Sequence, residues 1–309
     1  MLKKLFSLLF LVLFTAGMIP SSAEALTMAE IISGSAVNAA ENLSGEAKAY
    51  VVIDRSSGQI LLSKNADLKW PPASLTKLVT AMVFMESNTS LNKVIAMKKE
   101  DEVGGQRLVT KTGVSYKTRD LLHAALISSH NNAAHALARS TNLTDEQFID
   151  LMNNKAKALG AVHTHFLEST GMNPLNYTTA LDFAKIVDAA LKDPYISLIT
   201  KKNSYSFTSV NNKKYKHKIT STNKLLTDTE LSLVGGKTGF LEESDYNFAS
   251  VTKDQFGNEF VIVVLGAKDQ KIQFGQTKSL ALRATAIKVF GFDSQVAGTS
   301  TAANINFNK

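Results

Sequence analysis

Residues 74–86 read SLTKLVTAMVFME, and this stretch decides the fold. Its apolar residues lie nearly all round a helix, which is typical of a helix at the centre of a domain. Pro71 and Pro72 end the preceding segment, so we expect the helix to begin at Ser74. Lys77 follows one turn later on the same face as Ser74. In so apolar a helix, a lysine in the first turn is expected to line a cleft.

The chain on either side of this helix predicts a sheet built from both ends. β-Rich runs separated by turn signals predict strands over residues 48–54, 59–63, 231–234, 247–252 and 259–267. Apolar periodicity predicts helices over residues 119–127, 133–139, 145–159, 180–191 and 277–290. Strands at both ends with helices between them indicate the α/β (α+β) class, in one domain whose sheet pairs the two ends of the chain.

Residues 1–25 are interpreted as a secretory signal peptide. Two lysines precede an apolar run over residues 5–19, and Ala23 and Ala25 form a small-x-small cleavage site. An uncleaved anchor is the alternative, although the run is shorter than the ~20 residues of a spanning helix. We therefore expect export across the cytoplasmic membrane, to the periplasm or cell-wall space.

The remaining boundaries follow from composition. We expect a polar linker, rich in alanine and serine, over residues 26–46 and the folded domain over residues 47–292. The small, polar residues 293–309 are expected to form a disordered tail.

The composition excludes several classes of protein. The sequence contains no cysteine, which rules out disulfide scaffolds, thiolate metal sites and cysteine nucleophiles. The net charge of +7 is too diffuse over 309 residues to indicate nucleic-acid binding, and any membrane contact is expected to be peripheral. His163 and His165 look like a metal pair, but no carboxylate stands at a supporting spacing, so we expect no metal and no cofactor.

Three short elements in order along the chain point to serine acyl transfer. They are Ser-Leu-Thr-Lys at residues 74–77, Ser-His-Asn at residues 129–131 and Lys-Thr-Gly at residues 237–239. Each recurs elsewhere in similar form, but only Ser74 has both other elements downstream. A compact alternative of Ser74, Ser90 and Lys111 has the same order, but its Lys-Thr-Gly precedes a helix start instead of lying on a strand.

The first element supplies a nucleophile and a base. Ser74 lies near the positive end of the helix dipole, although a plain N-cap is the commonest role for a serine there. For Lys77 to act as a general base, its pKa must fall by ~3 units, which costs about 4 kcal/mol. Burial and the charge of Lys237 are the expected physical causes.

The other two elements suit proton relay and substrate binding. Ser129 is predicted to relay a proton to the leaving amine and Asn131 to hold the substrate amide. Lys237 and Thr238 offer a cation and a hydroxyl to a carboxylate, and Gly239 would admit substrate backbone. The alternative for the middle element is a helix cap and turn, and for the last element a plain turn.

Further segments strengthen a family resemblance. The sequence resembles the D-alanyl-D-alanine carboxypeptidases, the low-molecular-mass penicillin-binding serine peptidases, from about Lys48 to Phe292. Besides the three elements, the matching segments are residues 72–77, 119–122, 178–182, 222–226, 236–240 and 263–267. This resemblance implies the β-lactamase/transpeptidase-like fold, with a five-stranded antiparallel sheet flanked by helices, an all-helical region, and the site at their junction.

The resemblance also implies residue roles and partners. Ser74 would be acylated by the penultimate D-alanine of a peptidoglycan stem peptide, with Lys77 as base and Ser129 with Lys237 as the proton path. The backbone N–H groups of Ser74 and Phe240 would form the oxyanion hole. The terminal carboxylate of the peptide would bind Lys237 and Thr238. β-Lactam antibiotics would inhibit by acylating Ser74.

Departures from the family pattern keep alternatives open. His130 stands where the family usually has a small residue, Asn132 replaces a common aspartate, and residues 241–245 depart from the usual pattern. A D,D-endopeptidase that cuts cross-links and a catalytically silent wall-binding protein are the alternatives. A class A β-lactamase would require Glu168 as the deacylating base, but the residues after Glu168 do not match that class.

Overall fold

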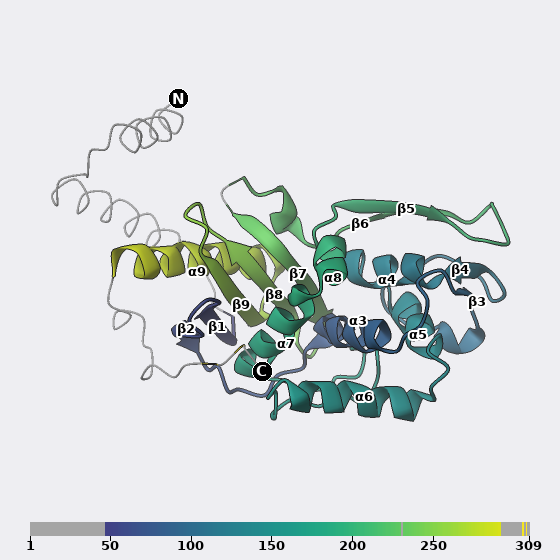
Figure 1. Cartoon of the computed structure of the whole chain (residues 1–309), viewed down its shortest axis with the longest axis horizontal. Coiled ribbons are helices and arrows are strands. Elements are labelled where there is room, and N and C mark those ends of the chain that lie inside the picture. Colours follow the sequence, from purple (N-terminus) through teal and green to yellow (C-terminus); the bar gives the residue numbers. More distant parts are fainter. Residues whose placement is uncertain (1–46, 230, 292–304, 306, 308–309) are drawn as a thin grey trace.

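The computed structural model describes residues 47–229 and 231–291, together with Ile305 and Phe307 (Figure 1). The expected signal peptide, the linker and most of the expected tail lie outside the described residues. The backbone N–H of Ile305 donates to the Gly58 carbonyl at 2.7 Å, and both described tail residues pack against the main apolar core. At these two positions the structure differs from the expected disordered tail.

The central sheet joins the two ends of the folded chain. Its five antiparallel strands lie in the order β2-β1-β9-β8-β7. Their bounds are β1 Ala49–Asp54, β2 Ile60–Lys64, β7 Ser232–Leu241, β8 Asp245–Lys253 and β9 Glu259–Ala267. β1 pairs with β9 from Ala49 opposite Leu265 to Asp54 opposite Phe260. The predicted pairing of the two chain ends is therefore confirmed.

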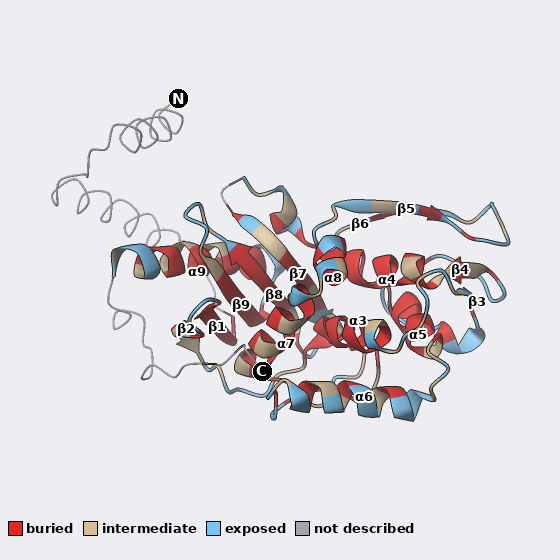
Figure 2. Cartoon of the chain, in the orientation of Figure 1, coloured by how far each residue is buried: buried red, intermediate tan, exposed pale blue. Residues whose placement is uncertain are grey.

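Helices cover both faces of this sheet, as Figure 1 shows. Alternate strand residues point to opposite faces, so Val51 packs with the helix α7 (Ala180–Lys192) while Val52 packs with α9 (Gln270–Phe290). The cluster on the α7 side continues into the helical region, which makes it the larger core. Figure 2 shows the buried strands and helix faces meeting there.

The helical region lies beside the sheet and holds the central helix. Its helices are α3 Lys77–Glu86, α4 Thr118–Ile127, α5 Asn131–Arg139, α6 Asp145–Ala158 and α8 Pro194–Thr200. Two small two-stranded sheets complete the fold. One pairs β3 Val94–Ala96 with β4 Ser115–Lys117, and the other pairs β5 Ser204–Thr208 with β6 Lys216–Thr220. Short 3-10 turns are η1 Ala73–Thr76, η2 Lys99–Asp101 and η3 Lys224–Thr227. In the described part of the chain, every helix is too short or too polar to cross a bilayer.

Two elements are longer than the sequence indicates. α9 begins at Gln270 instead of residue 277, because the Asp269 side chain caps it by accepting from the N–H of Ile272 at 2.7 Å. β7 extends through the third motif to Leu241, since its register with β8 continues across the Gly-rich stretch. The hairpin β5–β6 and the helix α8 have no counterpart among the predicted elements.

Candidate active site

Ser74, the predicted nucleophile, lies in a tight turn and not at a helix N-cap. Ser74 belongs to the 3-10 turn η1, and α3 begins at Lys77, so the N-cap alternative for Ser74 is wrong. Ala73 has a φ of 49°, in the left-handed region that costs a residue with a side chain of order 1–3 kcal/mol. The Nδ2 of Asn247 on β8 donates to the Pro71 carbonyl at 2.9 Å, which ties this turn to the sheet.

Lys77 touches Ser74 from the buried side of the turn. Its side chain is 1% exposed, and Nζ lies 2.8 Å from Ser74 Oγ. Nζ also donates to Asn131 Oδ1 and to the Thr170 carbonyl, both at 2.6 Å. Burial lowers the pKa of Lys77 to about 7, although the Glu168 carboxylate acts in the raising direction. An amine that loses its proton near neutral pH and faces a hydroxyl is suited to general-base catalysis.

Lys237 forms a second pair with Ser129. Its side chain is also 1% exposed, and Nζ donates to Ser129 Oγ at 2.9 Å and to the Thr238 carbonyl at 2.8 Å. Burial and the nearby charge of Lys77 hold the pKa of Lys237 well below its usual range. Burial therefore disfavours the charged form of both lysines, and the charge of Lys77 further lowers the pKa of Lys237.

The middle motif is shaped by its backbone. Ser129 has a φ of 60° and stands between α4 and α5. Asn131 opens α5, and its Nδ2 donates to the Gly104 carbonyl at 2.9 Å while Oδ1 accepts from Lys77. These bonds fix the orientation of the amide beside the two lysines. The alternative of a plain cap and turn accounts for the backbone of this motif but not for its side-chain contacts.

The third motif places a hydroxyl pair at the edge of the sheet. Thr238 and Thr222 lie with their side-chain oxygens 2.6 Å apart, and both side chains are partly exposed. Thr222 is a candidate site residue that the motifs alone did not reveal. Its position in the matching segment 222–226 was the available signal.

A close backbone contact explains why residue 239 is a glycine, and the sequence did not show this contact. A Cβ there would lie 2.8 Å from the Pro72 carbonyl oxygen and 3.2 Å from the Ser74 nitrogen. The glycine therefore lets β7 approach the turn that carries Ser74, and its role in admitting substrate backbone stays a prediction. Phe240 follows directly; its ring is half exposed and stacks on Tyr246 with centroids 4.4 Å apart.

Glu168 anchors a loop against Lys77. Its carboxylate accepts from the backbone N–H groups of Thr170 and Gly171 at 2.6 Å and from the Asn176 side chain at 2.8 Å. This loop presents the Thr170 carbonyl to Lys77. The contacts give Glu168 a role in positioning the loop and do not favour the β-lactamase alternative, in which this carboxylate would activate water.

The remaining sequence candidates lie outside this cluster. Lys111 belongs to an exposed turn instead of a strand, which removes the compact alternative set. His165 pairs through its backbone with Tyr177. Among the described residues, no group of three or more histidine and carboxylate side chains is arranged to hold a metal.

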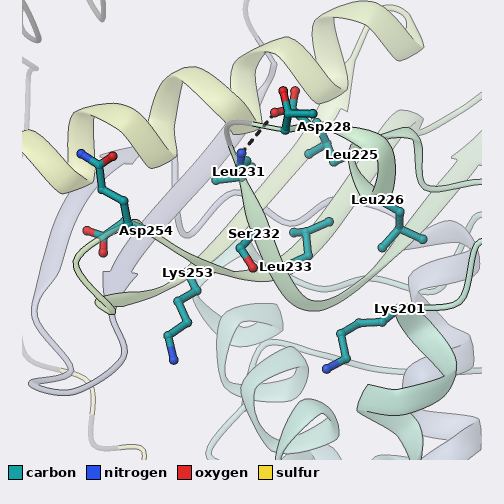
Figure 3. Close-up of a pocket in the computed structure, with 11 residues that line it drawn as sticks. Lys201, Leu225, Leu226, Asp228, Leu231, Ser232, Leu233, Lys253 and Asp254 are labelled. Carbon is teal, nitrogen blue, oxygen red and sulfur yellow. Dashed lines mark hydrogen bonds between the residues drawn. The ribbon is translucent and has the colours of Figure 1, made fainter. Parts of the chain in front are cut away.

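Two clefts lie near the ends of β7 and β6. The larger, about 460 Å³, surrounds the start of β7 near Ser232 and contains none of the predicted site residues (Figure 3). Its acidic groups are already engaged, because Asp228 accepts from Leu231 N–H and Asp254 accepts within its own turn. The smaller cleft, about 380 Å³, includes His130 of the middle motif.

Comparison with known proteins was made on both sequence and structure. A family model described as D-alanyl-D-alanine carboxypeptidase matches residues 36–269. The chain is 36% identical to the D-alanyl-D-alanine endopeptidase of Haemophilus influenzae over 71% of this chain and 74% of that protein. It is 31% identical to the D-alanyl-D-alanine carboxypeptidase DacC of Escherichia coli over 76% of this chain, and spans 60% of that relative's length.

Solved structures agree with the sequence relatives. A D-alanyl-D-alanine carboxypeptidase from Mycobacterium tuberculosis superposes with a TM-score of 0.69 at 27% identity, covering 84% of this chain and 94% of that one. A DD-transpeptidase from Streptomyces gives 0.71 at 25% identity, covering 78% of this chain and 98% of that one. These matches confirm the predicted fold class. The chain therefore belongs to the D-alanyl-D-alanine carboxypeptidase family of serine peptidases.

Proposed function

We propose that the protein is an exported D-Ala-D-Ala carboxypeptidase that trims peptidoglycan stem peptides through an acyl-enzyme on Ser74. One observation carries the proposal: the fully buried Lys77 amine, with a pKa of about 7, lies 2.8 Å from the Ser74 hydroxyl. Family membership supports the substrate class.

The proposed reaction begins with proton transfer from Ser74 to neutral Lys77. Ser74 Oγ then attacks the carbonyl of the penultimate D-alanine, and the N–H groups of Ser74 and Phe240 hold the resulting oxyanion, worth ~3 kcal/mol per donor. As the C–N bond breaks, the proton that Lys77 took from Ser74 passes by way of Lys237 and Ser129 to the departing amine of the terminal D-alanine, which leaves Lys77 neutral for the next step. Water then attacks the ester, gives one proton to Lys77, and restores the Ser74 hydroxyl.

Substrate binding is proposed at the groups around the nucleophile. Asn131 would hold the amide of the acyl part. The hydroxyls of Thr238 and Thr222 would donate to the terminal carboxylate, which the Lys237 charge attracts. A β-lactam would place its own carboxylate at these hydroxyls and acylate Ser74. No cofactor enters the scheme.

The test is release of free D-alanine from a pentapeptide analogue. We expect release by the wild type and at least a 10³-fold lower rate for Ser74→Ala, roughly the cost of losing a nucleophile in a serine hydrolase. Fluorescent penicillin should label the wild type alone. A folded wild type that releases no D-alanine and takes no label would overturn the proposal and leave the silent wall-binding alternative.

Endopeptidase activity is the second candidate. It is favoured by the relative with 36% identity and a second with 34% identity, both named D-alanyl-D-alanine endopeptidase. The two activities are separated by comparing cross-linked muropeptides with uncross-linked pentapeptides as substrates. Faster cleavage of the cross-linked species would assign the endopeptidase reaction.

Export is proposed from the sequence of residues 1–25 alone. The supporting features are the basic start, the apolar run and the small residues Ala23 and Ala25. Amino-terminal sequencing of protein recovered outside the cytoplasm should begin at Leu26. A mature protein that retains Met1 would instead support the anchor alternative.

A further inference from the structure

The smaller cleft lies directly beside the catalytic groups. His130 lines it, and its two chain neighbours touch the lysines: Ser129 accepts from Lys237, and Asn131 accepts from Lys77. A ligand that contacts His130 would therefore lie next to the residues that bind Lys77 and Lys237. The scheme above gives this cleft no role.

Both walls of the cleft are fastened to the middle motif. One wall is the loop 106–109, where the Gln106 carbonyl accepts from Asn131 N–H at 2.7 Å and Leu108 exchanges two bonds of 2.9 Å with the Asn132 side chain. The other wall is β6, whose Thr220 carbonyl accepts from the Ser128 hydroxyl at 2.6 Å. The cleft is thus a built feature of the fold, with one wall bonded to Asn131 and Asn132 and the other bonded to Ser128.

The charge of the lining is positive. Arg107, Lys216 and Lys218 are exposed along the walls, and none of the residues that line the cleft is acidic. None of these three cations forms an ion pair with another described residue. A group of unpaired cations around a concave site favours an anionic ligand.

His130 adds a polar side chain to the lining of the cleft. Its side chain is 8% exposed, and within the described part of the chain Nδ1 has no hydrogen-bond partner. That nitrogen is itself shielded from solvent. The neighbouring His217 is already bonded, since its Nε2 lies 2.9 Å from the Tyr116 hydroxyl. The His130 ring is therefore part of the wall of the cleft, and the exposed cations are the groups that a ligand reaches.

We propose that this cleft is a subsite for a free carboxylate on the acyl side of the substrate, carried by the residue that precedes the D-Ala-D-Ala pair. This rests on the proposed function. Asn131 is assigned to the amide of the acyl part, and the loop bonded to Asn131 forms one wall, so a peptide held there extends into the cleft on that side. Arg107 and Lys218 supply the charge, and the ring of His130 lines the cleft.

A matched pair of peptides tests the subsite. In acetyl-X-D-Ala-D-Ala, X is aminoadipate in one peptide and its side-chain amide in the other, so the two differ by one charge. We expect kcat/KM for D-alanine release to be about tenfold higher for the carboxylate, which corresponds to one ion pair of about 1.4 kcal/mol. Salt should weaken the preference.

Variants identify the residues responsible. The double variant Arg107→Gln with Lys218→Gln should remove the preference, so that the two peptides are cleaved with equal kcat/KM. Lys214→Gln removes the same kind of charge from the β5–β6 turn outside the cleft, and should retain the preference. No preference in the wild type, or a preference that survives the double variant, overturns the subsite.

Failure of the subsite is distinguishable from failure of the proposed function. If neither peptide is cleaved, the carboxypeptidase assignment fails. The affinities of the two peptides for Ser74→Ala, measured by isothermal titration calorimetry, still test the subsite. Tighter binding of the carboxylate peptide supports it, and equal dissociation constants overturn it.

Discussion

At the scale of the residue, the proposed chemistry depends on one amine, that of Lys77. Lys77 donates to three acceptors as an ammonium, and when it loses a proton, its lone pair can face Ser74 Oγ, 2.8 Å away. Burial of Lys77 in an apolar helix disfavours its charged form and so lowers its pKa, as expected from the sequence. The Thr170 carbonyl and the amide of Asn131 then keep the amine in place.

The pH dependence of acylation follows from this amine. Because burial lowers the pKa of Lys77 to about 7, we expect the rate of acylation by penicillin to rise between about pH 6 and about pH 8 and then level off. Lys77→Met should lower the rate by about 10²–10⁴-fold, the usual contribution of a general base. Stopped-flow acylation kinetics would measure both. A wild-type rate that is constant across this range contradicts the assignment, provided that thermal melting shows the protein folded.

His130 should not control that profile. Burial, together with the charges of His217, Lys77 and Lys237, lowers the pKa of His130 to about 4, so the ring stays neutral where the enzyme works. We expect His130→Gln to leave the midpoint of penicillin acylation unchanged near neutral pH. A midpoint that shifts by a full unit in this variant would show that His130 titrates with the catalytic groups.

Side-chain contacts within the motifs could be predicted from the sequence, whereas contacts from loops could not. The pairing of Ser74 with Lys77 follows from helical spacing, and the third motif was expected on a strand near them. Thr170, Glu168 and Thr222 reach the site through loop paths that no periodicity encodes. Only Thr222 lies in a segment that matches the family, residues 222–226, and that match gave no contact.

At the scale of the element, two glycines let the nucleophile turn pack against its neighbours. Gly239 brings β7 close to it, and Gly171 brings the loop after Glu168 close to it. A Cβ on Gly171 would lie 1.9 Å from the Ala73 carbonyl oxygen, and the φ of Gly171 is +86°. The turn at residues 72–74 can therefore pack in this way only because positions 171 and 239 carry no side chain.

Gly171→Ala should displace the nucleophile turn. We expect the variant to lose more unfolding free energy than a strained φ alone costs, which is ~1–3 kcal/mol, because the clash of the added Cβ adds to the strain. We also expect it to acylate slowly. Gly113→Ala is the matched control, because Gly113 also has a φ of +86° but no atom within 4 Å of the added Cβ. Denaturant unfolding and penicillin labelling measure both. Equal losses in the two variants would mean that strain, not the clash, dominates.

Elements marked by a local sequence pattern could be predicted, whereas elements that depend on pairing or packing with distant residues could not. β9 was predicted over its full length because its apolar run is bounded by turn residues on both sides. β7 was shortened, since Gly235 and Gly236 weaken strand propensity and only pairing with β8 carries the strand onward. The β5–β6 hairpin is polar on one face, and its strands pack on the helical region through Phe207 and Ile219, which no local pattern indicates.

At the scale of the whole molecule, the fold is closed by contacts between its two ends. β1 pairs with β9, and Lys288 near the end of α9 bonds to Asp54 at the end of β1. Burial alone would raise the pKa of Asp54, but hydrogen bonds from Lys288 and Ser56 outweigh it and lower the pKa to about 2. A carboxylate with a lowered pKa stabilises the folded state above its unfolded pKa, and this stabilisation is lost as the pH falls toward 2.

Asp54→Asn should therefore destabilise the protein in a pH-dependent way. We expect a lower unfolding free energy than the wild type at neutral pH, with the gap closing as the pH falls from the usual value of 3.8 to about 2. Urea unfolding across this range measures the gap. Asp67→Asn changes an exposed carboxylate and should show little difference at any pH. A gap for Asp54→Asn that is independent of pH would contradict the ion-pair account.

The central claim is that Ser74 is the nucleophile of a serine peptidase, and its covalent adduct tests this most directly. The protein is incubated with benzylpenicillin, digested, and analysed by tandem mass spectrometry. We predict one penicilloyl group, attached to the side chain of Ser74. An adduct on any other residue, or a folded protein that carries none, would contradict the account.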